Sequence, residues 1–312
     1  MAQYNPQVDL IFKKIFGVEE NKDLLISLIN SIVSEADQVQ DVTLKNPYNH
    51  QNFLNDKLSI LDIKAQGHNG KLYNIEIQIT DEKNYEKRAL YYWGKMYSEQ
   101  LKAKGVYQDL QKAIGIHILN FECLPEHLSQ DRYHNVFHIK EKELGFPFFR
   151  DLELHTIELS KFAHSLTASD DTTEMQAFKK KVHQSLDWWI GFLTRHDLIK
   201  QMNEVKPDVQ KAMDVLEYMH LSDEERLAYD DREKYLLLIN DALEKQFEEG
   251  VEQGKIEGLI EGEQIGIEKG LIEGEQKAKR EMALEMIRDG EPDQRIIKYA
   301  KITQSELDDI KG

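Results

Sequence analysis

Residues 57–80 hold two apolar segments joined by a turn, and together they predict a β-hairpin. The turn contains two glycines and an asparagine, which tolerate the backbone conformations that tight hairpins require. Side chains alternate between the two faces of a strand. Asp62 and Lys64 therefore share one face of the first strand, and Glu76 and Gln78 share one face of the second.

Pairing across this turn would bring Asp62 close to Glu76 within apolar sequence. Buried carboxylates are costly unless a positive charge neutralises them. A divalent cation is the usual solution, and hard oxygen ligands suit Mg²⁺. The alternative is a half-buried hairpin whose polar face is simply solvated, as in many antiparallel sheets.

The helix predicted over residues 84–102 carries a basic and aromatic stripe. Arg88, Tyr92, Lys95 and Glu99 are spaced four, three and four residues apart, which places them on one helix face. Buried acids on strands beside such a helix indicate hydrolysis of phosphodiester bonds.

Composition sets the outer limits. The 312 residues are enough for one core of moderate size and an extension. The chain shows no apolar run of membrane length and no signal-peptide pattern. Cys123 is the only cysteine, which excludes an intrachain disulfide and a zinc–thiolate cluster. We therefore expect a protein of the reducing cytoplasm.

The net charge of −17 argues against a broad DNA-binding surface. Residues 240–312 hold 19 acidic and 11 basic residues, whereas residues 1–165 hold 23 and 19. Much of the excess therefore lies in the tail. Affinity for DNA would depend on local clusters of basic residues and would be weak and salt-sensitive.

Strand patterns recur at 112–121, 133–140 and 152–159, between helical segments, and this alternation predicts an α/β layered core. From about residue 172 the pattern is helical. His134 and His138 would share a strand face. Because no acidic residue is near them at the spacing of a metal site, we interpret both as surface or packing residues.

Glycine recurs at every fourth residue from Gly250 to Gly274, among Glu, Ile, Leu and Lys. Each interior glycine costs a helix about 0.5–1 kcal/mol relative to alanine. We expect a helix of low intrinsic stability, and whether it forms a homodimer through its small residues or serves as a spacer stays open. The last segment has the outline of a helix-turn-helix with Ser305 as an N-cap. Its final helix is acidic, which favours a helical hairpin used for protein contacts.

The chain resembles the recombination-promoting nuclease and putative transposase family, a branch of the PD-(D/E)XK nucleases. The similar segments span nearly the whole chain, and the most specific is the IEIQ strand followed by R-x2-YY-x4-Y. The resemblance implies an α/β fold: a restriction-endonuclease-like core with a mixed central sheet flanked by helices, and an all-helical C-terminal extension. It also implies a nuclease-like domain over 1–165, a helical region over 166–247, the glycine tract over 248–277 and a short helical tail over 278–312.

The resemblance also implies roles for individual residues. Asp62 and Glu76 would bind Mg²⁺ or Mn²⁺ with the backbone carbonyl of Ile77. Gln78 stands where the wider superfamily has lysine, and glutamine supplies neither a positive charge nor a general base. Lys64 is the first candidate to compensate.

Four further residues have supporting roles in this interpretation. Arg88 and Lys95 are the second candidates for a compensating charge, and Tyr92 belongs to the same helix face. Asp9 matches an N-terminal acidic position of the family, although an acid in the first turn of a helix is also stabilised by the helix dipole.

Two function classes follow. The first is a Mg²⁺-dependent DNA endonuclease acting in recombination or on mobile-element DNA, in which metal-activated water attacks phosphorus. The second is a nuclease-fold protein of weak or no activity that serves as a DNA- or protein-binding assembly module. Whether a cation reaches the site in place of the missing lysine separates the two.

Overall fold

The computed structural model describes residues 4–46, 48, 63–80, 84–101, 105–124, 132–164, 166 and 173–312. The chain divides into two compact units, Met1–Ile239 and Asn240–Gly312. Within the described residues, no helix is both long enough and apolar enough to cross a membrane.

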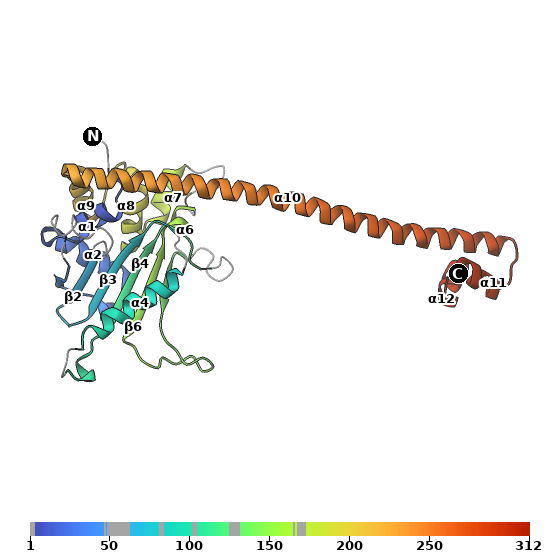
Figure 1. Ribbon diagram of the computed structural model, residues 1–312, viewed down its shortest axis with the longest axis horizontal. Helices are drawn as coiled ribbons and strands as arrows, with labels where there is room; N and C mark the ends of the chain where they lie inside the picture. The colour runs from blue at the N-terminus through green and yellow to red at the C-terminus, as the bar shows by residue number, and fades with distance from the viewer. Residues whose placement is uncertain are drawn as a thin grey trace. The chain divides into compact units, whose positions relative to one another are not determined.

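A mixed six-stranded sheet of order β1-β2-β3-β4-β6-β5 forms the centre of the first unit among the residues described (Figure 1). Its strands are β1 (Val42–Leu44), β2 (Ile63–Gly67), β3 (Leu72–Gln78), β4 (Ala113–Leu119), β5 (His134–Phe137) and β6 (Leu152–Glu158). β3, β4 and β6 are parallel neighbours, and the other pairings are antiparallel. The α/β core expected from sequence is confirmed, while β1 was not predicted.

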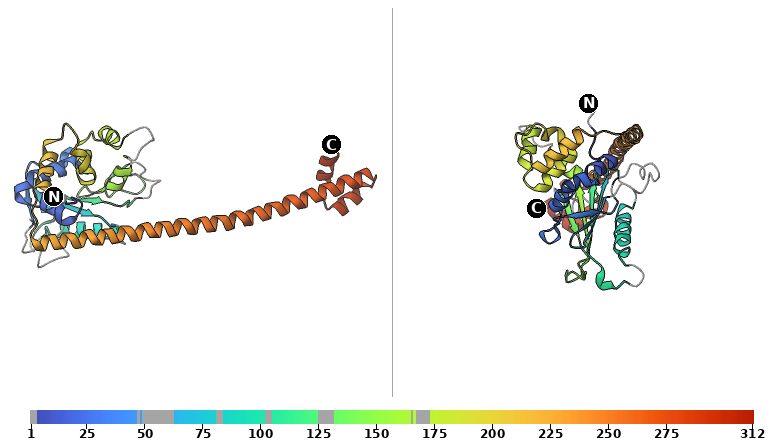
Figure 2. Two further views of the ribbon diagram at one scale, coloured as in Figure 1. Left: turned by 90° about the horizontal axis from the view of Figure 1, so that it is seen from above. Right: turned by 90° about the vertical axis from the view of Figure 1, so that its left-hand side faces the viewer.

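Helices cover both faces of the sheet. In the right-hand view of Figure 2, α4 (Tyr85–Ser98) lies on one side and the yellow helices lie on the other. The other α-helices among the described residues of the first unit are α1 (Asp9–Phe16), α2 (Lys22–Ile32), α6 (Leu159–His164), α7 (Glu174–Lys181), α8 (Ser185–Ile199), α9 (Pro207–Glu217) and the start of α10 (Asp223–Arg288). The predicted helix over 84–102 is shorter than expected, because α4 ends at Ser98.

The alternation of side chains along β3 separates an apolar face from a polar one. Tyr73, Ile75 and Ile77 are buried on the side of α1, with which β3 is in contact. Glu76 and Gln78 take the opposite face, the one that α4 covers. The apolar face joins the main core, which continues into α8 through an aromatic cluster around Trp189. Burial of this face fixes the register of β3, because a slip of one residue would turn its apolar side chains to the wrong side.

In the second unit, the end of α10 packs with α11 (Asp293–Ala300) and α12 (Gln304–Lys311) around a small apolar core. Thr303, rather than the predicted Ser305, is the N-cap of α12, and it forms a capping box with Glu306. The glycine tract is helical within α10. A Cβ added at any glycine from Gly250 to Gly274 would meet no described atom within 4 Å.

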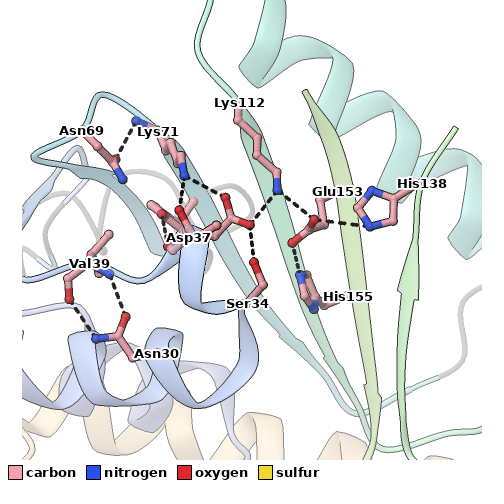
Figure 3. Close-up of polar contacts among 12 residues, drawn as sticks. Asn30, Ser34, Asp37, Val39, Asn69, Lys71, Lys112, His138, Glu153 and His155 are labelled. Carbon is pink, nitrogen blue, oxygen red and sulfur yellow. Dashed lines mark hydrogen bonds and ion pairs between the residues drawn. The ribbon is translucent and has the colours of Figure 1, made fainter. Parts of the chain in front are cut away.

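A buried ion cluster lies at the end of the sheet where β4 and β6 begin (Figure 3). Asp37 accepts from Lys71 and Lys112 at 2.8 Å each, and Lys112 also reaches Glu153 at 2.8 Å. The cluster joins the segment after α2 to β4 and β6. Two carboxylates and two ammonium groups balance within it, so each charge is neutralised where it is buried.

Histidines extend this cluster on the side of β6. His155 contacts Glu153 at 2.8 Å, and its other ring nitrogen lies 2.9 Å from His134. His138 lies 3.4 Å from Glu153. Glu153 therefore contacts His138 directly and His134 through His155, a proximity that depends on strand pairing and that sequence spacing does not reveal.

The Asp37 cluster predicts a loss of stability in acid. Burial alone would raise the pKa of Asp37, but hydrogen bonds from Lys112 and Lys71 lower it to about 2. The carboxyl is then stabilising above its ordinary pKa, and this contribution is lost as the pH falls from about 4 to 2. We expect the free energy of unfolding to fall by roughly 2–3 kcal/mol over that range. Urea titrations followed by tryptophan fluorescence at each pH measure this free energy. Asp37→Asn should lower the stability at pH 7 and weaken the dependence of stability on pH between about 4 and 2. A variant with the same pH dependence as the wild type would contradict the assignment to Asp37.

Gly115 predicts a steric limit in β4. A Cβ there would lie 2.7 Å from Leu154 Cδ2 and 3.1 Å from His117 Nε2. We expect Gly115→Ala to cost about 1–3 kcal/mol of unfolding free energy, through overpacking. Gly94→Ala in α4 is the matched control, since a Cβ meets nothing within 4 Å there, and the substitution should stabilise by about 0.5–1 kcal/mol. Equal effects in the two variants would mean that the strand can relax around the added methyl group.

Candidate functional site

The candidate site lies on the face of β3 and β4 that α4 covers. Glu76 in β3 is 7% exposed and is paired in register with His117 of β4. Gln78 shares this face and sits at the carboxyl end of β3. A buried carboxylate is thus held on the sheet at the strand that the sequence singled out.

Among the described residues, Gln78, Arg88 and His117 contact the Glu76 carboxylate. Gln78 donates from Nε2 to Oε1 at 2.6 Å. The Arg88 guanidinium on α4 approaches the same oxygen, with Nη2 at 3.5 Å. His117 Nδ1 lies 3.6 Å from Oε2. A glutamine, a cation and an imidazole therefore surround a single carboxylate.

His117 was missed by the sequence analysis. It is 2% exposed, and burial together with the Arg88 guanidinium and His155 lowers its pKa to about 4, so the ring is neutral at pH 7. Tyr85 packs edge-on against the ring at a centroid distance of 5.6 Å. The available signal was a histidine within the otherwise apolar strand AIGIHIL.

Arg88 is the member of the predicted stripe on α4 that reaches Glu76 among the contacts described. Tyr92 is 38% exposed and lies against Tyr91, and Lys95 pairs with Glu99 on the outer surface at 3.9 Å. The helix face predicted from spacing therefore starts at the site with Arg88 and continues onto the protein surface.

The remaining predicted site residues on the hairpin are placed by the β2–β3 register. Asp62 lies outside the described residues. Ile63, which follows it, pairs with Ile75, which precedes Glu76. Lys64 is opposite Asn74, which lies two residues before Glu76 on the same face of the sheet.

Ile77 lies next to Glu76, but its side chain is buried on the opposite face of β3. Its predicted role as a metal ligand concerns the backbone carbonyl alone.

Asp9 is engaged elsewhere in the described part of the chain. Its carboxylate accepts from the backbone of Leu10 at 2.6 Å and pairs with Arg232 of α10 at 2.7 Å. Burial raises the pKa of Asp9, while Arg232 opposes that shift. No contact among the described residues joins Asp9 to Glu76.

A second buried acid lies at the carboxyl end of β6. Glu158 is fully buried and accepts from the backbone of Cys123 and Leu124 at 3.2 Å each, and it forms an ion pair with Lys161 of α6. The Glu158 carboxylate thereby holds the segment that follows β4. Phe121 and Cys123 of this segment pack against Tyr85, which borders the site.

The side chains of this face fit a hard divalent cation. Glu76 supplies a carboxylate, and the amide oxygens of Gln78 and Asn74 are buried without a hydrogen-bond partner among the described residues. Oxygen donors of this kind are the preferred ligands of Mg²⁺ and Mn²⁺. No group of three His, Cys, Asp or Glu side chains with the geometry of a metal site occurs within the described residues.

Comparison with known proteins identifies the family of the chain. No protein of curated function and no solved structure matches the chain. The family model of the PD-(D/E)XK nuclease family transposases matches residues 6–246. This range includes the described sheet and the start of α10. PD-(D/E)XK nucleases typically use divalent metals. The chain therefore belongs to the PD-(D/E)XK nuclease family transposases.

Proposed function

We propose that this protein is a metal-dependent DNA endonuclease that hydrolyses phosphodiester bonds. The observation that carries the proposal is the buried Glu76 carboxylate, held by Gln78 and facing Arg88, in a chain of this nuclease family. A carboxylate kept at 7% exposure beside a guanidinium is costly to build and serves well as a metal ligand.

Asp62 and Glu76, with the backbone carbonyl of Ile77, would hold Mg²⁺ or Mn²⁺. When bound, the cation would acidify water and neutralise charge that grows on the scissile phosphate. The pairing of Ile63 with Ile75 supports the assignment of Asp62, because these described residues are the immediate neighbours of Asp62 and Glu76.

Gln78 has a definite task in this arrangement. Its amide nitrogen donates to Glu76 and fixes the carboxylate, while its amide oxygen has no hydrogen-bond partner among the described residues. That oxygen can accept a hydrogen bond from a water molecule and orient it. It cannot remove a proton or supply positive charge, so these functions must come from other groups.

Arg88 is the best placed of the candidate cations. Its guanidinium is 3.5 Å from Glu76, whereas the pairing of Lys64 with Asn74 and the position of Lys95 at the surface give neither ammonium such a contact among the described residues. A guanidinium remains charged at any physiological pH and binds phosphate oxygens in a bidentate manner. We therefore assign to Arg88 the charge that lysine supplies elsewhere in the superfamily, with Lys64 second.

DNA is the substrate that the family implies, and the exposed part of the α4 stripe, with Tyr92 and Lys95, is the surface that we assign to it. The chain is acidic, so binding should be weak and should fall with salt. Action in recombination or on mobile-element DNA, and a cytoplasmic location, are part of the same proposal.

The organisation of the chain is also part of the proposal. We retain a nuclease-like domain over 1–165, a helical region over 166–247, the tract over 248–277 and a tail over 278–312. Exposed apolar residues such as Leu259 and Leu271 in the tract are compatible with a homodimer. The second candidate function, a nuclease-fold protein of weak or no activity that binds DNA or protein, is favoured by one observation, the absence of lysine at Gln78.

Nicking of supercoiled plasmid tests the function directly. We expect relaxation with Mg²⁺ or Mn²⁺, none with EDTA, and a loss of about 100-fold or more in Glu76→Gln, since a metal ligand supplies several kcal/mol of transition-state stabilisation. Glu86→Gln, which removes an exposed carboxylate of α4 outside the stripe of Arg88, Tyr92 and Lys95, is the matched control and should retain activity. If the folded wild-type protein nicks no DNA with either metal, the endonuclease proposal is refuted and the binding module is favoured.

The source of the compensating charge is tested by paired variants. We expect Arg88→Gln to lower the rate of nicking by about 100–1000-fold, as loss of one preorganised electrostatic group does in other enzymes. Lys64→Gln should have a smaller effect, and Arg88→Lys should recover part of the loss. The reverse order of Arg88→Gln and Lys64→Gln would return the role to Lys64.

A further inference from the structure

One row of the sheet beneath α4 is polar across four strands. Glu76 of β3 is opposite His117 of β4, and His117 is opposite Thr156 of β6. Thr156 is in turn opposite Asn135 of β5. All four side chains are buried. Polar groups in such a place are retained only where their hydrogen bonds are made or put to use.

His117 is the member of this row that is adjacent to the carboxylate. Its Nδ1 atom is buried and has no hydrogen-bond partner among the described residues. The distance of 3.6 Å to Glu76 Oε2 is slightly too long for a hydrogen bond. The imidazole is thus aimed at the carboxylate oxygen without engaging it.

An imidazole beside a metal-binding carboxylate can ligate the cation or hold the carboxylate. The Arg88 guanidinium lies 3.5 Å from the other oxygen of Glu76, and its positive charge also acts on the His117 imidazole. Its positive charge would repel a cation placed between Glu76 and His117. The geometry therefore favours a group that holds the carboxylate.

We propose that His117 is a positioning residue for Glu76. Its neutral ring carries the proton on Nδ1, and this N–H donates a hydrogen bond to Glu76 Oε2 when the carboxylate binds a cation. This inference rests on the proposed metal-dependent function. Gln78 fixes Oε1 through its amide, and His117 fixes Oε2, so that the carboxylate cannot rotate. Hydrogen bonds at catalytic groups are often long before the ligands bind, and tighten in the complex.

The surroundings of the ring fix its orientation. Tyr85 packs edge-on against it from α4, and Gly115 leaves the space that its Nε2 side requires. Partners of metal ligands that act in this way typically contribute about 10–100-fold to metal affinity.

Calorimetric titration of the full chain with Mn²⁺ tests the proposal without relying on activity. We expect His117→Phe, which keeps a ring and removes the donor, to weaken Mn²⁺ binding by about tenfold at an unchanged melting temperature. His117→Asn, whose amide can donate from a similar position, should recover affinity to within about threefold. His134→Phe is the matched control, a histidine on the opposite face of the sheet, and should bind Mn²⁺ like the wild type.

The outcomes separate this inference from the proposed function. Wild-type protein that binds no Mn²⁺ would refute the metal-dependent function and this inference with it. Wild-type binding with equal affinity in His117→Phe would refute the role of His117 alone.

A second measurement needs no folded variant at this position. Nitrogen-15 NMR of histidine-labelled wild-type protein reports which ring nitrogen carries the proton. A proton on Nδ1 of His117, with a shift on addition of Mg²⁺, is expected; a proton on Nε2 would overturn the proposal.

Discussion

The register of the parallel strands is the constraint on which the rest of the structure depends. β3 pairs with β4 and β4 with β6 without a bulge, so every second residue of each strand falls on the same face of the sheet. In β3 and β4 the face on the side of α1 is apolar and packs against helices, which determines the register. The same register places the side chains of Glu76, His117 and Thr156 next to one another on the opposite face. The position of the candidate site is therefore a consequence of core packing on the reverse side of the sheet.

Charge on the two faces is handled in different ways. On the core side, Asp37 and Glu153 are matched by Lys71 and Lys112, so the cluster is neutral within itself and joins separate parts of the chain. On the α4 side, one carboxylate is contacted by an amide, a guanidinium and a neutral imidazole. The first arrangement is what a structural ion cluster requires. The second holds a carboxylate in position, which is what a metal ligand needs.

The departure from the superfamily pattern at Gln78 is easier to understand in this setting. A lysine on the same strand would place its charge beside Glu76 directly. Here the glutamine makes the short hydrogen bond to Glu76, and the positive charge comes from Arg88 on a helix. Under the proposed function, the two tasks that lysine combines, hydrogen bonding and charge, would be divided between two elements. Burial, together with the nearby Arg88 guanidinium, lowers the pKa of His117 and keeps its imidazole neutral at pH 7.

The sequence by itself determined the α/β core, the hairpin that carries Glu76 and Gln78, and the family, because these follow from local periodicity and from motifs of adjacent residues. Only the tertiary structure decided which residues meet Glu76. His117 and Arg88 come from a different strand and a helix, and Glu153 reaches His138 in the same manner across the sheet. Local patterns report the period of each element, whereas contacts between elements depend on strand order and register. Those are set by burial of the whole core, and no single segment of the sequence contains them.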